Sequence, residues 1–112
     1  GRVCEFEYKN IFDAQGGVLK FDENASVNLP QNLRNAVKIA VNPSKITLSK
    51  TPIESYLEGI LHSVSLYLGK DLLVKIKIGD FLIKTLAPNS QNFNIGERIY
   101  FKFDEGAFLG LE

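Results

Sequence analysis

The clearest alternation of apolar and polar residues runs from Leu72 to Thr85, LLVKIKIGDFLIKT. From Val74 to Ile78 apolar residues alternate with lysines, a pattern typical of a β-strand with one buried face. Gly79-Asp80 then predicts a two-residue type II′ hairpin turn, whose first position needs the positive φ that glycine adopts without strain. The apolar face is expected to pair Ile78 with Phe81, Ile76 with Ile83 and Val74 with Thr85. The other face is expected to pair Lys77 with Leu82 and Lys75 with Lys84.

The remainder of the chain predicts further short strands. Alternating or short apolar runs predict strands over residues 1–12, 18–21, 27–29, 37–41, 46–48, 99–103 and 107–111. Clusters of Gly, Pro, Asn and other polar residues predict turns or connections over residues 13–17, 31–36, 49–55, 87–94 and 104–106. The chain is therefore expected to be all-β.

One stretch, residues 56–69, fits two structures. Its apolar residues recur at helical spacing, with Pro52 suited to a helix start and Gly69 to a helix end. The alternative is a strand that His62 interrupts and that Gly59 and the β-branched residues favour. Such a strand would carry on one face Ile60, Val64, Leu66 and Leu68. The local pattern does not separate the two.

An internal repeat favours the strand. Residues 37–46 resemble residues 99–108, with an offset of 99 − 37 = 62. Gly1-Arg2-Val3 likewise matches Gly59-Ile60-Leu61, with an offset of 59 − 1 = 58. Half-repeats of about 1–50 and 56–112, each too small to bury its own apolar face, would form one barrel-like body. The alternative is the general likeness of any two β segments.

Composition limits the classes of function that are expected. The 112 residues suggest one domain, and 13 basic against 13 acidic residues give zero net charge. A neutral chain argues against a dedicated binder of nucleic acid or acidic membranes. The single cysteine fits a reducing compartment, and no apolar run is long enough to span a bilayer. The first residues, GRVCEFEYKN, lack a signal-peptide pattern and a starting Met, which suggests an excised domain.

The sequence does not predict catalytic chemistry. No GxxxxGK[ST] phosphate-binding loop is present, so Gly69-Lys70 is interpreted as a turn. His62 lacks partners for a metal site, and Cys4 alternates with aromatic residues in a way that favours burial. Two acidic pairs, Asp22-Glu23 and Asp104-Glu105, lie in expected turns, where carboxylates are usually solvated. The domain is expected to be neither an enzyme nor a metal protein.

The second half resembles the TOBE domain, the C-terminal part of ATP-binding subunits of ABC importers for sugars, polyamines or iron. The likeness rests on Tyr67-Leu68-Gly69 with Asp71 one place late, a lysine-rich hairpin, and Gly96-Glu97-Arg98 before an aromatic strand. In the first half, VNPSKITL stands where these subunits usually carry Arg-Pro-Glu. Pro43 and Ile46 are kept, but Asn42 replaces the Arg and Ser44 the Glu.

The resemblance implies an OB-like β-barrel built from two related β units. It also implies a regulatory and dimerisation role, with no cofactor in this domain because ATP and Mg²⁺ would bind a separate nucleotide-binding domain. The implied partners are a second copy of the ATPase subunit and, through the parent protein, permease subunits. The implied location is the cytoplasm, at the inner face of the membrane.

Two other functions stay open. A stand-alone oxyanion-binding module, as in molybdate-binding members of this fold, would use Ser44, Lys45 and Thr47, or Gly69 and Lys70. An OB-type nucleic-acid binder would stack bases on some of the eight Phe and four Tyr residues. Core packing is the favoured role for these aromatic residues.

Overall fold

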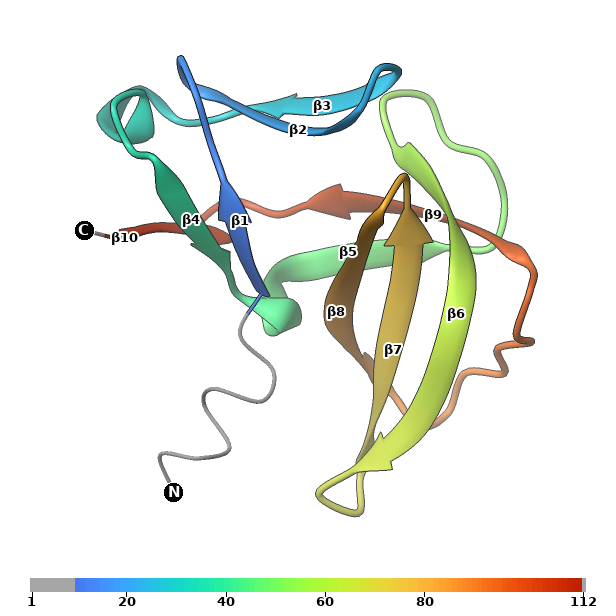
Figure 1. Cartoon of the computed structure of the whole chain (residues 1–112). Coiled ribbons are helices and arrows are strands. Elements are labelled where there is room, and N and C mark those ends of the chain that lie inside the picture. Colours follow the sequence, from blue (N-terminus) through green and yellow to red (C-terminus); the bar gives the residue numbers. More distant parts are fainter. Residues whose placement is uncertain (1–9, 112) are drawn as a thin grey trace.

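The computed structural model describes residues 10–111, which form ten β-strands and two short 3-10 turns (Figure 1). No α-helix occurs among them, which confirms the all-β class and the strand prediction for the stretch that also fitted a helix. The elements are β1(Asn10–Asp13), β2(Val18–Asp22), β3(Ala25–Asn28), η1(Gln31–Leu33), β4(Lys38–Val41), η2(Pro43–Lys45), β5(Ile46–Ser49), β6(Leu57–Tyr67), β7(Asp71–Ile78), β8(Phe81–Pro88), β9(Arg98–Phe103) and β10(Phe108–Leu111).

The strands form three antiparallel sheets. Their orders are β1-β4-β10, β2-β3 and β5-β9-β6-β7-β8, and none of these sheets closes into a barrel. Of the predicted strand over residues 1–12, the described part enters β1 at Asn10, while Cys4 and the repeat anchor at Gly1 lie outside the described residues.

The β7–β8 hairpin has the predicted register. Ile78 lies opposite Phe81, Ile76 opposite Ile83 and Val74 opposite Thr85, and Gly79 has a φ of 58°. All of these apolar-face residues are buried except Phe81, which lies nearest the turn. The pairing and the buried face thus agree with those predicted from the alternation and the Gly79-Asp80 turn.

The buried face of β6 differs from the prediction. Leu61 lies opposite Ile76 but Ser63 lies opposite Lys75, so His62 is the extra residue of a β-bulge. Because the bulge inserts one residue, Ile60 and Val64 lie on opposite faces of the sheet. Ile60 lies opposite Lys77 on the outer face and is 40% exposed, so its predicted place on the face of Val64 is wrong.

The connection expected over residues 87–94 begins later than predicted, because β8 continues through Pro88. β8 is an edge strand, paired with β7 alone. A proline is tolerated on an edge, since it has no N–H to offer a further strand.

Two chain segments far apart in sequence run antiparallel along a continuous bent ladder. β4 pairs with β10, with Val41 opposite Phe108, and β5 pairs with β9, with Ile46 opposite Phe103. Between these pairs lie residues 42–45 and 104–107, here called the crossover. The register is symmetric, because the offset of 62 carries Val41 onto Phe103 and Ile46 onto Phe108. Figure 1 shows β5 running alongside β9, and β4 meeting β10 on the other side of the bend.

The crossover hydrogen bonds obey the same symmetry. The amides of Asn42 and Asp104 donate to the carbonyls of Ala107 (2.9 Å) and Lys45 (2.8 Å). Within each segment one turn bond closes, from the Lys45 amide to the Asn42 carbonyl (3.0 Å) and from the Ala107 amide to the Asp104 carbonyl (3.1 Å). The two bends are therefore locally equivalent.

The first strand corresponds to a strand of the second half at a different sequence offset. The Ala14 amide donates to the Val37 carbonyl (2.8 Å), and Gly59 lies opposite Ile99, which the offset of 62 relates to Val37. Ala14 thus corresponds to Gly59, an offset of 59 − 14 = 45, where the sequence comparison expected 58 from Gly1. β7 and β8 are longer than β2 and β3, and this added length changes the spacing.

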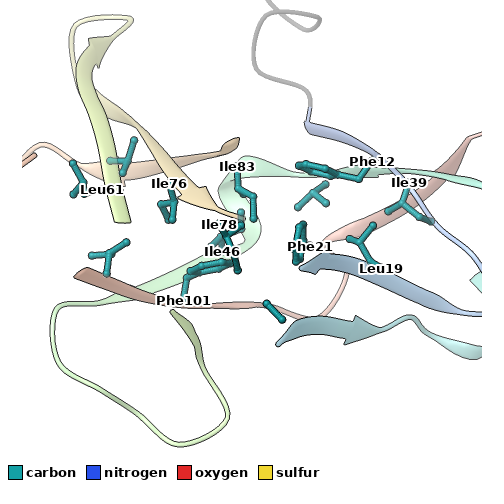
Figure 2. Packing of buried hydrophobic residues seen from close by; sticks show 14 of the residues in the cluster. Phe12, Leu19, Phe21, Ile39, Ile46, Leu61, Ile76, Ile78, Ile83 and Phe101 are labelled. Carbon is teal, nitrogen blue, oxygen red and sulfur yellow. The ribbon is translucent and has the colours of Figure 1, made fainter. Parts of the chain in front are cut away.

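One core joins the sheets. Buried side chains from both halves of the chain belong to a single cluster, and Figure 2 shows Phe12 and Phe21 beside Ile78 and Ile83. The rings of Phe12 and Phe21 meet edge to face with centroids 5.6 Å apart, a favourable aromatic geometry.

Asn10 joins the three-stranded sheet to the five-stranded one. Its amide nitrogen donates to the Lys84 carbonyl and its oxygen accepts from the Lys84 amide, both at 2.6 Å. The same nitrogen lies 3.4 Å from the Val41 carbonyl. The Asn10 side chain therefore occupies the place of a neighbouring peptide group on the edge of β8.

Candidate functional site

The first group of predicted site residues lies at the crossover. Asn42 caps η2, because its side-chain oxygen accepts from the Ser44 amide at 2.9 Å. Pro43 is buried at the first position of this turn, and its carbonyl accepts from the buried Thr85 hydroxyl at 3.1 Å. The interactions of these residues hold the bend against β8.

The remaining residues of this group face outward. Ser44, Lys45 and Thr47 are exposed, and the Thr47 hydroxyl donates to the Asp104 carboxylate at 2.7 Å. Asp104 and Glu105, interpreted from sequence as a solvated pair, form the turn of the second crossover segment. Asp104 is half-buried and Glu105 is exposed.

The second group lies in the turn between β6 and β7. Gly69 and Lys70 are exposed, and the Lys70 amide donates to the Tyr67 carbonyl at 3.3 Å. Neither residue lines a cavity with the crossover residues. Asp71 does, since it shares a cavity of about 200 Å³ with Ser44. A carboxylate beside Ser44 does not favour an anion at this point.

Gly96 and Glu97 shape the turn that leads into β9. Gly96 has a φ of 92°, and its amide donates to the Leu61 carbonyl at 2.8 Å. The Glu97 carboxylate accepts from the Asn94 amide at 3.2 Å, and its carbonyl accepts from the Leu61 amide at 2.8 Å. The role of both motif residues is therefore to form the turn before β9.

Two larger cavities flank the crossover. One, of about 520 Å³, is lined by residues that include Ala40, Asn42, Ser44, Leu86 and Leu109. The other, of about 470 Å³, lies between β3 and the β9–β10 turn and is here called the phenylalanine pocket. Its floor contains Phe101, Phe103 and Phe108. The sequence assigned these rings to the core and gave no sign of a cavity.

The other titratable candidates lie apart from these cavities. His62 is exposed at its bulge, and Asp22 accepts from the Asn24 amide at 2.7 Å in the β2–β3 turn. Among residues 10–111, no three His, Cys, Asp or Glu side chains are grouped so that they could hold a metal ion. Within that range no helix is long and apolar enough to cross a membrane.

Comparisons with known proteins give no family assignment. The chain matches no protein-family model, and no curated protein matches it. By its fold, the described part of the chain is an all-β domain with a symmetric strand crossover.

The sequence analysis did not single out two residues whose side chains hold the crossover region in place, Thr85 and Asn10. Thr85 had a sequence signal, because it is the one polar residue on the predicted apolar face of the hairpin. Asn10 had none, since its partners at Val41 and Lys84 are 31 and 74 positions away.

Proposed function

We propose that this chain is the accessory domain that follows the nucleotide-binding domain of an ABC importer ATP-binding subunit. In this role it performs no chemistry and holds two subunits together while nucleotide binding opens and closes them. The observation that carries the proposal is the crossover, at which each half of the chain adds a strand to a sheet of the other half. The TOBE resemblance implies a tandem of two β units. Of its motif positions, Pro43 lies in this crossover and Ile46 begins β5 directly after it.

The OB-like part of the proposal concerns the five-stranded sheet. Its two edge strands, β5 and β8, both line a cavity of about 210 Å³ that includes Ile46, Leu48, Leu86 and Pro88. We assign this five-stranded sheet to the OB-like unit that the TOBE resemblance implies. The 3-10 turn η2 packs against its edge strand β8. In the proposed setting the domain lies in the cytoplasm at the inner face of the membrane, and the separate nucleotide-binding domain holds ATP and Mg²⁺.

A row of apolar residues offers a surface for the second subunit. Ile11 and Leu109 lie on either side of Ala40 in register across the β1-β4-β10 sheet, and they are 47% and 60% exposed. The Lys38–Asp13 ion pair, at 2.8 Å, lies beside them on the same face. An apolar row with a charged border is the usual composition of an interface centre and its rim.

The direct test is the reading frame that encodes this chain. The proposal predicts a domain with a GxxxxGK[ST] loop upstream of Gly1 and permease genes nearby. A frame without such a domain would reject the proposal. If the domain is present, neighbouring genes for a solute-binding protein would identify the class of solute.

A second test uses the parent subunit. Leu109→Glu places a charge in the apolar row and is expected to weaken subunit dimerisation about tenfold or more, as measured by sedimentation velocity. Val37→Glu is the matched control, because Val37 is equally apolar and exposed but lies outside the row. Equal dimerisation of the Leu109→Glu variant and the parent would remove the row from the interface.

A further inference from the structure

The phenylalanine pocket combines an apolar floor with an acidic rim. Its floor is formed by Phe101, Phe103 and Phe108, with Leu57 from the start of β6 beside them. Asp104 and Glu105 form part of the rim. At about 470 Å³ the pocket is within the range of small-molecule sites.

The floor offers aromatic surface to a ligand. The rings of Phe103 and Phe108 have centroids 5.0 Å apart and planes inclined by 48°, and both side chains are half-buried. Phe101 lies beneath them, fully buried and 5.8 Å from Phe103. The faces of such rings attract both apolar groups and cations.

The rim carries two carboxylates. The Asp104 carboxylate is positioned by the Thr47 hydroxyl at 2.7 Å. Neither Asp104 nor Glu105 takes part in the two ion pairs found in the described part of the chain, Lys38–Asp13 and Arg98–Glu58. The one lysine of the lining, Lys102, has its ammonium 5.9 Å from the Tyr56 ring centroid. Two carboxylates are thus available to a cationic ligand.

A strained residue lies at the same pocket. Ser55 lines it with a φ of 75°, within a turn closed by the bond from the Tyr56 amide to the Ile53 carbonyl (3.1 Å). Non-glycine residues seldom adopt this conformation, and those that do are concentrated at ligand clamps and other functional sites.

We propose that the phenylalanine pocket binds a small organic cation, an ammonium or guanidinium group attached to an apolar body. The body packs on Phe103 and Phe108, and the cation lies between the ring faces and the carboxylates of Asp104 and Glu105. The site does not depend on the proposed transport role, because it rests on the pocket alone.

The test is calorimetric titration of the full chain with three probes of similar size that share a phenyl ring: phenethylamine, 2-phenylethanol and phenylacetate. Phenethylamine is expected to bind saturably with a Kd of about 1 mM or lower. The alcohol should bind about tenfold more weakly, and the acid should not bind. Chemical-shift changes in nuclear magnetic resonance spectra should be centred on Phe103, Phe108 and Glu105.

Charge-removing variants locate the binding. Glu105→Gln changes an exposed side chain and should weaken phenethylamine binding about threefold, and Asp104→Asn with Glu105→Gln about tenfold. Asp80→Asn, at an exposed turn away from the pocket, is the control. Equal binding of amine and alcohol, unchanged binding by the double variant, or no saturable binding would overturn the proposal. Binding of a lysine-rich peptide without binding of the amine would assign the pocket to a protein partner instead.

Discussion

Asn10 shows how one side chain can join two sheets. A side-chain amide has the donor and acceptor of a peptide group, so it can pair with an edge strand without adding a strand. Here it pairs with Lys84 through two bonds of 2.6 Å and is itself buried. Removing it takes away both of these part-buried hydrogen bonds to the Lys84 backbone, and the loss of such bonds lowers stability.

Asn10→Ala is therefore expected to lower the free energy of unfolding by about 2–3 kcal/mol. Urea denaturation of the variant and the parent measures the change. Asn28→Ala, which changes an exposed asparagine in β3, should alter it by less than about 0.5 kcal/mol. Equal stability of the Asn10→Ala variant and the parent would show that Asn10 does not join the sheets.

Leu68 carries a conformational cost. It has a φ of 52° and is 72% exposed, and Gly69 after it has a φ of 78°. Positive φ at both central positions is characteristic of a type I′ turn, where asparagine is preferred to leucine. Leu68→Asn is expected to raise the free energy of unfolding by about 1 kcal/mol, seen as a higher melting temperature. A lower melting temperature would mean that Leu68 makes a stabilising contact.

At the scale of elements, local pattern predicts what local forces determine. The β7–β8 register follows from alternation and one turn, because the turn brings neighbouring residues together. The face of β6 was misassigned at Ile60, because the interruption noted at His62 was not interpreted as a β-bulge. The sequence predicted a turn at Gly69-Lys70 and a short strand over residues 46–48, but how far these candidate residues lie from one another depends on tertiary packing.

The β7–β8 turn also packs on β2. A Cβ added to Gly79 would lie 2.7 Å from the Phe21 carbonyl oxygen, and its φ of 58° is strained for alanine. Gly79→Ala is expected to cost about 2–4 kcal/mol, from strain and a clash that the backbone cannot easily relieve.

Gly69→Ala separates these two effects. Gly69 has a φ of 78° but nothing within 4 Å of an added Cβ, so its substitution should cost only about 1 kcal/mol. Both variants are compared by chemical denaturation. If the two cost the same, the β7–β8 turn does not approach β2 closely.

At the scale of the whole molecule, the crossover makes the two halves interdependent. β4 finds its neighbours in β1 and β10, and β5 finds its neighbour in β9, so each half completes a sheet of the other. The sequence repeat points to related units but not to this exchange, because pairing across about 60 residues depends on which strands the core brings together. The loop closure involved also suggests slow folding.

β4–β5 and β9–β10 form one antiparallel ladder that bends at the crossover. The most direct measurement is nuclear Overhauser spectroscopy of the isotope-labelled chain. We predict cross-strand contacts between Val41 and Phe108 on one side of the crossover and between Ile46 and Phe103 on the other. Contacts of β4 with β5, or of β9 with β10, as local hairpins would show that this ladder does not form.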